Sequence, residues 1–465
     1  MRNALKLVAP GIEAPLDPDF RPAVLANRAF RAEVDASGQG IPLAIALERE
    51  SGKISVYETQ IFGPAAGRGA ANVAYAERIV KFLLWQRGGW KITIGGDAEV
   101  AAAIKKAYAP DGARAFDVGL MSDVYEQPFT VEAVELANIP EASDVPEALG
   151  GHLDGCRVGF DLGASNRKAS AVIDVKVVFS EEVGWDPSNQ TDPQYHYDEV
   201  MSAIRTAASH LPRLDAVGGS AAGIYVNNRT LVGSLYRGIP KDLFEAHIKD
   251  MYVNISKELG VPLVLVNDGE VTALAGGLDL EDTGVLGIAM GSSEAGGYLN
   301  LDGHITGWLD ELAFCPMDYN PDAAVDEWSG DSGCGVVYFS LQAVARLAPV
   351  AGIDVEKDMG QPEILKLVQE LQQEDDQRAH AIMQTIGVYL GYTIAHYADF
   401  YDIKHLLILG GVTSGQGGPI ILEEARRVLA KEFPKLAESI DLHLPEEANR
   451  RVGQSIAAAS LPELP

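Results

Sequence analysis

The order of apolar and polar positions along the chain predicts strands and helices in alternation, above all in the last two-thirds. Short apolar runs typical of strands occupy residues 157–161, 168–173, 175–179, 262–266, 285–290 and 405–409. Apolar residues recur at helical spacing over residues 197–211, 243–259, 335–347, 362–373, 376–401, 418–433 and 450–460. Paired strands followed by regular helix–strand alternation predict a mixed α/β fold with two lobes.

The first 150 residues follow a less regular pattern. Residues 1–40 are expected to be mostly irregular, and residues 41–61 form a hairpin around Ser51-Gly52. The pattern continues with a helix, a strand, a helix capped by Asp97 and a further strand, placed at residues 71–87, 90–94, 98–109 and 113–118. Residues 137–155 combine Pro, Gly and acidic residues as a linker does. We therefore expect an extra small α/β module of unknown role at 1–150, a first lobe at 151–275 and a second lobe at 276–465.

The composition excludes several classes of protein. The 465 residues, 47% hydrophobic and 22% charged, are typical of a globular chain of two to four domains. A net charge of −29 argues against a nucleic-acid-binding surface, because phosphates would be repelled. The apolar runs are too short to span a bilayer and the N-terminus lacks a signal-peptide core, so we expect a cytoplasmic protein with no membrane partner. The cysteines lack CxxC spacing, and four histidines share no metal-ligand spacing; these are His196, His210, His304 and His396.

The first candidate for chemistry is the turn that follows the strand at 157–161. Gly163 permits a tight turn, and the small residues Ala164 and Ser165 let backbone N–H groups come close to a phosphate. Asp161 is then placed to orient a hydrated magnesium ion. An ordinary strand–turn, in which Asp161 satisfies the turn, explains the segment equally well.

The second candidate is the Asn267-Asp268 pair, where an apolar strand ends and a helix follows. A carboxylate at this point can accept a proton from a substrate hydroxyl, and the helix N-terminus stabilises its negative charge. Taken alone, the pair is better explained by Asp268 acting as the cap of that helix.

Two further strand ends carry small residues. Gly291, Ser292 and Ser293 suit a second phosphate-binding turn, although a hairpin turn would use the same residues and Glu294 would repel a phosphate. Gly410 and Gly411 leave room for a flat base beside the backbone, although a plain turn would also use them. The order of the segments favours function: phosphate turn, base, phosphate turn and adenosine turn are what two homologous ATPase lobes require.

On these motifs, residues 157–460 resemble the ROK group of sugar kinases and regulators, within the actin/hexokinase (ribonuclease H-like) ATPase superfamily. The resemblance is carried by DLGAS at 161–165, VNDGEVTAL at 266–274, GSSEAGG at 291–297 and LGGVTSG at 409–415. It implies a two-lobed ATPase fold that uses ATP and Mg²⁺ to phosphorylate a hydroxyl of a sugar, either a hexose or a related polyol. Homodimers are common in this group, so we expect one here.

The resemblance also implies roles for individual residues. Asp268 would be the general base, and Asp161 would hold Mg²⁺ through water. The residues implied to bind the sugar are Asn267, Glu311 and Gly219. Those implied to bind ATP, besides Asp161, are Gly163, Ala164, Ser165, Gly291, Ser292, Ser293, Gly410 and Gly411.

The sequence departs from the ROK pattern at four places. A sugar- and zinc-binding His of the group falls on Phe314, and of the Cys-rich zinc loop only Cys334 remains, so we expect no structural zinc. The phosphate turn carries Glu294. The acidic N-terminal module does not resemble the DNA-binding helix-turn-helix of the group's regulators. A non-catalytic sugar- or nucleotide-binding regulatory protein therefore stays open as the alternative, as does an ATPase or acyl-group kinase of the wider superfamily.

Overall fold

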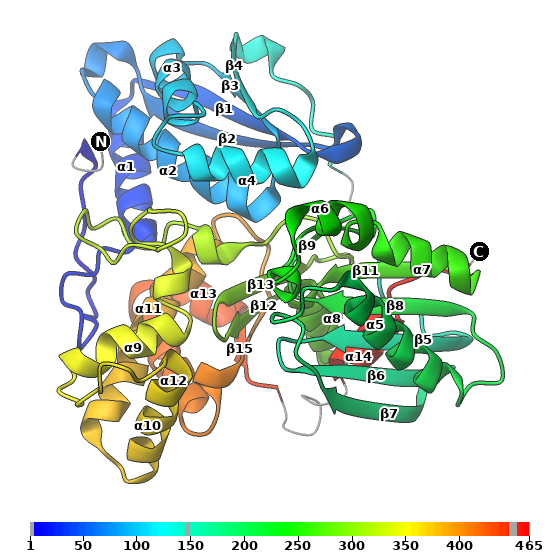
Figure 1. Cartoon of the computed structure of the whole chain (residues 1–465). Helices are drawn as coiled ribbons and strands as arrows, with labels where there is room; N and C mark the ends of the chain where they lie inside the picture. Colours follow the sequence, from blue (N-terminus) through cyan, green and yellow to red (C-terminus); the bar gives the residue numbers. More distant parts are fainter. Residues whose placement is uncertain (1–3, 145–148, 446–452, 465) are drawn as a thin grey trace.

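The computed structural model describes residues 4–144, 149–445 and 453–464. Figure 1 shows the N-terminal residues at the top, in blue and cyan, above two lobes that lie side by side. The green first lobe precedes the yellow and orange second lobe in the sequence. No helix in the described ranges is long and apolar enough to cross a membrane.

The first lobe is built on a mixed sheet with the strand order β11-β8-β5-β6-β7. Strands β5 to β7 form an antiparallel meander, and β8 and β11 lie parallel to β5. The strands are β5 (Cys156–Leu162), β6 (Asn166–Ile173), β7 (Lys176–Gly184), β8 (Ala216–Ala221) and β11 (Leu263–Asn267). The strands predicted at 157–161, 168–173, 175–179 and 262–266 are thereby confirmed.

Helices cover both faces of this sheet. Val158 and Phe160 of β5 point into a core with α5 (Pro193–Ala208) and α7 (Met251–Leu259). The helix predicted at 243–259 is interrupted, because α6 (Lys241–Leu243) leads into a π-helical turn at Phe244–Ile248 before α7 starts. On the opposite face, Gly159 and Gly218 allow α14 (Gly453–Ala459) to lie directly on the backbone. Although the predicted boundaries assign α14 to the second lobe, it packs on the sheet of the first.

The second lobe repeats the central part of this arrangement. Its sheet has the order β13-β12-β14-β15, in which β13 is antiparallel to β12 and the other strands run parallel to it. The strands are β12 (Val285–Met290), β13 (Glu294–Leu299), β14 (His405–Leu409) and β15 (Asp441–His443). The helices are α9 (Leu341–Val350), α10 (Gln361–Gln373), α11 (Gln377–Tyr397), α12 (Gly417–Glu432) and α13 (Pro434–Ser439). The two predicted phosphate turns therefore follow strands at the same position of each lobe, β5 and β12.

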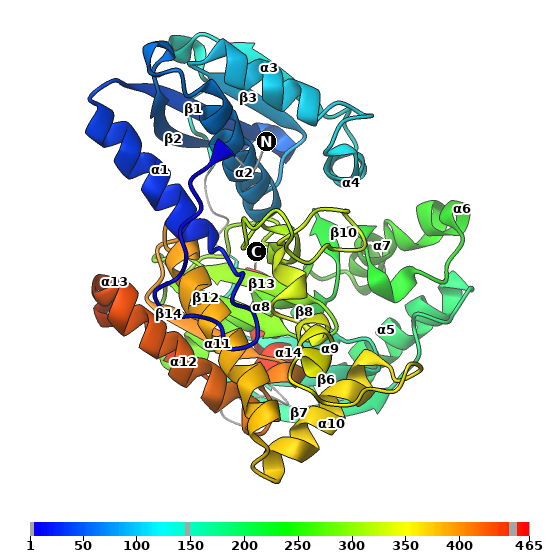
Figure 2. The same ribbon diagram turned by 90° about the vertical axis from the view of Figure 1, so that its left-hand side faces the viewer.

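The N-terminal residues form their own sheet, β2-β1-β3-β4, with helices around it (Figure 2). We call residues 4–144 the N-terminal module. Its strands are β1 (Gly40–Glu48), β2 (Ile54–Phe62), β3 (Lys91–Gly95) and β4 (Thr130–Val134), and its helices are α1 (Ala23–Ser37), α2 (Gly69–Arg87), α3 (Ala98–Ala107) and α4 (Ala115–Tyr125). The predicted hairpin, the helices α2 and α3 and the Asp97 cap are confirmed, the last by a 2.8 Å bond from the Val100 N–H.

Two predictions for this module are wrong. Residues 23–37 form helix α1, which buries Val24, Phe30 and Val34 at helical spacing. Residues 115–125 form helix α4 instead of a strand at 113–118. The short window was misleading because Val118 and Met121 form a helical stripe that becomes visible only beyond residue 118.

The cores tie the N-terminal module to the second lobe. One continuous hydrophobic core runs from the module into the second lobe, whereas the first lobe has a core of its own. Residues before α1 run along the second lobe, where the Leu16 N–H bonds to Thr385 and the Tyr389 hydroxyl donates to Asp17. Helix α8 (Asp268–Leu280) joins a smaller cluster between the lobes. The packing therefore makes the module and the second lobe one body, against which the first lobe is set.

Candidate functional site

Helix α8 begins at the point where β11 ends, and Asn267 caps it. The Asn267 side chain accepts the Gly269 N–H at 2.7 Å, and Glu270 completes a capping box. Asp268 is thus the first helical residue, and its carboxylate accepts a longer bond of 3.1 Å from the same N–H. The cap that the sequence would assign to Asp268 is supplied by Asn267, which leaves the Asp268 carboxylate for other work.

The position of Asp268 depends on close backbone packing between α8 and β13. A Cβ atom on Gly269 would overlap the carbonyl of Gly296, and one on Gly297 would overlap the carbonyl of Gly269. Only glycine permits this approach. Gly296 and Gly297 look like part of a phosphate turn in the sequence. In the structure they instead form a packing contact that places Asp268 next to the second lobe.

Three carboxylates from different segments interact electrostatically around this helix start. Burial, followed by the charge of Asp161 on β5, raises the pKa of Asp268 to about 6. Burial, followed by the charges of Asp268 and Asp310, raises the pKa of Glu311 to about 7. Asp268 thus interacts electrostatically with both Asp161 and Glu311, the residues that the sequence-based hypothesis assigns to the magnesium ion and the sugar.

Asp161 is held by two donors. Its Oδ1 accepts the Ser220 hydroxyl at 2.8 Å, and its Oδ2 lies 3.3 Å from the Lys168 ammonium group. Sequence reasoning missed Lys168, although a strand and a tight turn were predicted at Asp161, because the pairing of β5 with β6 and its register, which sets Asp161 opposite Lys168, were not predicted. Lys168 places a positive charge beside the first phosphate turn, defined here as residues 163–165.

The first phosphate turn connects β5 to β6. Its Gly163 N–H bonds to the carbonyl of Asn166 at 3.0 Å, and the Gly163 carbonyl accepts the Trp185 indole N–H at 2.8 Å. Ala164 and Ser165 are exposed. Trp185 therefore holds the base of the turn while its tip stays open.

The second phosphate turn, residues 291–293, connects β12 to β13. The Gly291 N–H bonds to the carbonyl of Ser293 at 2.9 Å, and Ser292 and Ser293 are exposed. The segment is a hairpin turn in structure, and its hydroxyl groups are open at the carboxyl end of β12. The structural and the functional interpretations of this turn are therefore compatible.

The Glu294 side chain is buried and does not place a negative charge at this turn. Its side chain is 2% exposed, lies against Gly335 and accepts a 3.1 Å bond from the Tyr397 hydroxyl. Burial raises the pKa of Glu294 to about 8, so the carboxyl is mostly neutral at pH 7. The repulsion of phosphate expected from the sequence is removed by burial.

Replacing Glu294 with Gln should change how stability depends on pH. A raised pKa means that the stability contributed by this carboxyl is complete below its unfolded value, about 4.3, and is lost as the pH rises through about 8. We therefore expect the unfolding free energy of Glu294→Gln, relative to that of the wild type, to increase as the pH is raised from 5 to 9. Urea unfolding at several pH values measures this. Glu370→Gln, at an exposed position, is the control, and parallel curves for wild type and Glu294→Gln would contradict the assignment.

The predicted adenosine turn lies beside the second phosphate turn. Gly410 has φ +101°, and a Cβ there would overlap the backbone of Met290, the last residue of β12. Gly411 is held through its carbonyl, which accepts the Gln369 amide at 3.0 Å. A cavity of about 760 Å³ adjoins this turn, with Gly410 and Ser414 in its wall, and its volume suits a nucleoside.

The loop that carries Glu311 is held by the N-terminal module. The Glu311 N–H bonds to the Trp85 carbonyl at 3.1 Å, and the Asp310 N–H bonds to the Gln86 carbonyl at 2.9 Å. Trp85 and Gln86 lie in the last turn of α2, where carbonyl groups have no partner within the helix. The C-terminal end of α2 thus fixes the backbone of the predicted sugar ligand.

Phe314 packs against the N-terminal module. It stands at the position where the resemblance to ROK proteins implies a metal-binding histidine. Its ring lies 4.2 Å from the Trp85 ring and 5.5 Å from the Phe116 ring, measured between centroids. An aromatic contact of this kind stabilises the fold by more than its buried apolar area alone would. This departure from the family pattern is therefore a contact with the N-terminal module.

Asp331 makes a second, charged contact with the module. Its carboxylate lies 3.0 Å from Arg78, 3.3 Å from Lys81 and 2.8 Å from Arg114, and its side chain is 3% exposed. Glu77 pairs with both arginines, and Asp117 lies 3.3 Å from Lys81. Burial opposes a charge on Lys81, yet the neighbouring carboxylates raise its pKa above the usual value. These six side chains form what we call the Asp331 ion cluster, in which the cations and carboxylates balance.

Not every predicted site residue reaches this region. Gly219 lies inside β8, where a Cβ would overlap the Phe160 ring, so it serves the packing of the first-lobe sheet. A smaller cavity, about 210 Å³, is lined instead by Gly223, by Asn267 and by Lys53 of the module. Asn267 is also engaged within the protein, because its amide donates to the Gly223 carbonyl at 2.7 Å.

The residues present fit hydrated Mg²⁺ and a nucleotide. Each Asp161 oxygen accepts one donor and keeps a second lone pair for a water of the ion, which suits a metal that retains its water shell. The neutral Glu294, the open tips of both phosphate turns and the cavity beside Gly410 are compatible with the phosphates and the nucleoside.

Comparison with known proteins places the chain by its fold. No family model matches the sequence, and no curated protein does. Among solved structures, the ROK hexokinase of Thermus thermophilus is 18% identical, with a TM-score of 0.50 over 65% of this chain and 97% of the hexokinase. The chain has the ROK fold. The prediction of an actin/hexokinase-like ROK fold is thereby confirmed.

Other ROK structures extend the comparison. A ROK family transcriptional regulator, a homologue of the E. coli MLC protein, is 16% identical, with a TM-score of 0.50 over 66% of this chain and 78% of the regulator. A ROK family glucokinase from Streptomyces griseus, solved with glucose and AMPPNP, is 19% identical, with a TM-score of 0.48 over 66% of this chain and 98% of the glucokinase. A hexokinase and a transcriptional regulator thus share the ROK fold with this chain.

Proposed function

We propose that the chain is a kinase that transfers the γ-phosphoryl group of ATP to a hydroxyl group of a sugar or related polyol. The observation that carries the proposal is the placement of Asp268. It starts a helix that Asn267 caps, it shares its environment with Asp161 and Glu311, and its pKa of about 6 leaves it ionised at neutral pH. A poised carboxylate beside a second acidic residue suits a general base next to a metal-bound phosphate.

In this mechanism Asp268 accepts the proton of the substrate hydroxyl as its oxygen forms a bond to the γ-phosphorus and the bond to ADP breaks. Glu311 binds further hydroxyl groups, and Asn267 has one remaining amide proton for the same purpose. The phosphate turns at 163–165 and 291–293 hold phosphate oxygens through backbone N–H and hydroxyl groups, and Gly410 and Gly411 flank the adenine. Asp161 would hold Mg²⁺ through water, and the ion would supply positive charge to the phosphates.

Lobe closure completes the site in this proposal. Glu311 belongs to the body formed by the second lobe and the N-terminal module, whereas Asp161 belongs to the first lobe. The module also reaches the first lobe through exposed ion pairs, in which Glu126 contacts Arg229 and Lys249. Exposed pairs contribute little and exchange easily. They therefore allow the module to travel with the second lobe as the substrates are enclosed.

The pH dependence of turnover should follow the base. Because Asp268 acts only when deprotonated and its pKa is about 6, we expect kcat/KM to be constant near pH 7–8. Below pH 6 it should fall by about tenfold per unit, since the rate then follows the ionised fraction. Initial rates between pH 5 and 8, at a constant ionic strength, measure the profile. A flat profile down to pH 5 would argue against Asp268 as the base.

Calorimetric titration with Mg-ATP, with and without a pooled sugar library, tests the proposed function. We expect micromolar binding that one sugar strengthens, because closure places both substrates between the same surfaces. Deconvolution of the pool then names the substrate. An absence of ATP binding at millimolar concentration would overturn the kinase proposal.

A non-catalytic sugar-binding regulator is the second candidate, and Lys168 is the observation that favours it. Its ammonium group lies 3.3 Å from the Asp161 carboxylate and adds a positive charge where the kinase proposal needs a metal cation. Sugar binding without Mg-ATP binding would support the regulator. Recovery of Mg-ATP binding in Lys168→Met would show that this lysine blocks the metal.

A further inference from the structure

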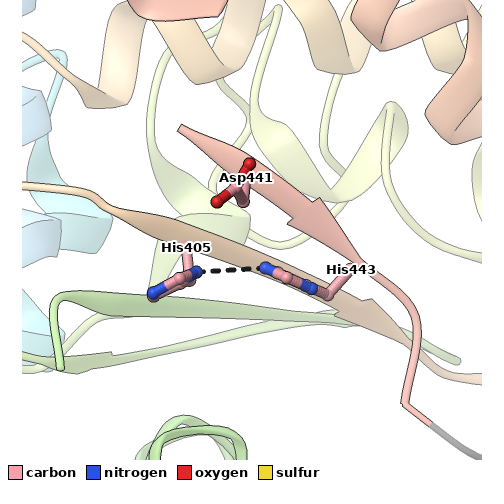
Figure 3. A group of neighbouring side chains, drawn as sticks. All are labelled: His405, Asp441 and His443. Carbon is pink, nitrogen blue, oxygen red and sulfur yellow. Dashed lines mark hydrogen bonds between the residues drawn. The ribbon is translucent and has the colours of Figure 1, made fainter. Parts of the chain in front are cut away.

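A cluster of metal-ligand side chains lies on the edge of the second-lobe sheet, away from the proposed catalytic carboxylates. Strands β14 and β15 are parallel, with His405 paired to Asp441 and Leu407 paired to His443. Because side chains alternate along a strand, His405, Asp441 and His443 project from one face. Figure 3 shows the two rings side by side with the carboxylate above the space between them.

The atoms of this cluster are close enough to bind one ion. The Nδ1 atom of His405 lies 3.1 Å from the Nε2 atom of His443. One ligand atom from each of the three residues lies within 4.8 Å of the others. Two nitrogens bound tetrahedrally to Zn²⁺ at 2.0–2.1 Å are separated by roughly 3.4 Å, so the rings need only a small adjustment.

Asp282 supplies an independent indication of a ligand site. It lies just before β12, and its Oδ2 is 3.0 Å from the Nε2 atom of His405. Its Oδ1 accepts from Lys404 at 2.9 Å, which keeps Asp282 ionised and in place. A carboxylate that accepts from one ring nitrogen fixes the proton there and leaves the lone pair of the other nitrogen free, which is the arrangement seen behind metal-binding histidines. In His405 that free lone pair is on Nδ1 and points at His443.

We propose that His405, His443 and Asp441 bind a divalent ion of the Zn²⁺ type, with Asp282 orienting His405. Two imidazoles and one carboxylate suit such an ion, and a water molecule completes the coordination. Binding replaces the hydrogen bond between the two histidines, because both nitrogens then direct lone pairs at the metal. This site is separate from the Cys-rich zinc loop of ROK proteins, whose place is taken here by residues 329–334.

The site would act on the wall of the larger cavity. His443 lies at the end of β15, and the next residues, Leu444 and Pro445, line the 760 Å³ cavity together with Gly410. A metal bound between β14 and β15 would link the strand before Gly410, β14, to the strand before Leu444 and Pro445, β15. We therefore expect the metal to stiffen the cavity without taking part in phosphoryl transfer.

The test is metal binding by the full-length protein, with no catalytic readout. Chelator-treated protein is titrated with Zn²⁺ by calorimetry, and Co²⁺ absorption reports the coordination. We expect one Zn²⁺ per chain in the wild type, loss of that binding in His443→Ala and Asp441→Asn, and about 10–100-fold weaker binding in Asp282→Asn. Mg²⁺ should not compete, because it prefers oxygen ligands.

His247→Ala is the matched control, since His247 is exposed on the first lobe and should leave Zn²⁺ binding unchanged. Melting curves without metal confirm that each variant is folded. Asp441 is exposed, so Asp441→Asn keeps the test decisive if His443→Ala fails to fold. Absence of Zn²⁺ binding, or equal binding by wild type and the folded ligand variants, would overturn the proposal whether or not the chain is a kinase.

Discussion

Asp268→Asn is expected to lower kcat by about 10²–10⁴-fold, the range that general-base catalysis supplies. Asn has the same shape and still accepts a bond from the Gly269 N–H, so the start of α8 should be preserved. It cannot take the hydroxyl proton. Sugar and Mg-ATP affinities should therefore stay within a few-fold of the wild type, and initial-rate kinetics with calorimetry on the same preparation measure both quantities.

Asp198→Asn is the control for this experiment. Asp198 is an exposed carboxylate on α5 of the first lobe, outside the proposed site, and its replacement should leave kcat unchanged. If Asp268→Asn retained wild-type kcat, the base would be another group. If it lost sugar binding and turnover together, Asp268 would be a binding residue.

The second large effect is expected at Asp331, where the N-terminal module meets the second lobe. Asp331→Ala removes the carboxylate shared by Arg78, Lys81 and Arg114 and leaves excess positive charge in a buried place. Breaking a buried pair in this way costs about 3–5 kcal/mol. The backbone of Glu311, the proposed sugar ligand, is hydrogen-bonded to the same helix, α2. Disturbing this helix should therefore raise the KM for the sugar more than the KM for ATP.

Urea unfolding and the two KM values measure these effects, with Asp331→Asn as a milder variant if Asp331→Ala does not fold. Glu370→Ala removes an exposed partner of Lys366 and should cost less than about 1 kcal/mol. A loss at Asp331 no larger than at Glu370 would mean that the ion cluster does not hold the module in place. A rise in ATP KM equal to the rise in sugar KM would contradict the link to Glu311.

Local signals carried the sequence prediction a long way. Apolar runs predicted the strands β5, β11, β12 and β14, because strands buried on both faces consist of nearly continuous apolar residues. The Asn267-Asp268 pair was placed correctly between strand and helix. Which of the two residues caps α8 was not readable, since both types cap helices equally well.

Features that depend on distant pairing could not be predicted. Asp331 meets Arg78 of α2 and Arg114, just before α4, both more than 200 positions earlier. His405 meets His443 only because β14 and β15 are neighbours. Nothing local marks such contacts. Glu294 gives the same lesson for charge: a carboxylate that looks repulsive in the sequence becomes neutral once it is packed against Gly335.

Phosphorus NMR of a mixture of the protein, Mg-ATP and the sugar found by calorimetry tests the kinase proposal most directly. We expect a sugar-phosphate resonance to grow at the same rate as that of ADP in the wild type, and neither to grow with Asp268→Asn. ADP released without a phosphorylated sugar, or no ADP at all with both substrates bound, would contradict the proposal that this chain phosphorylates sugars.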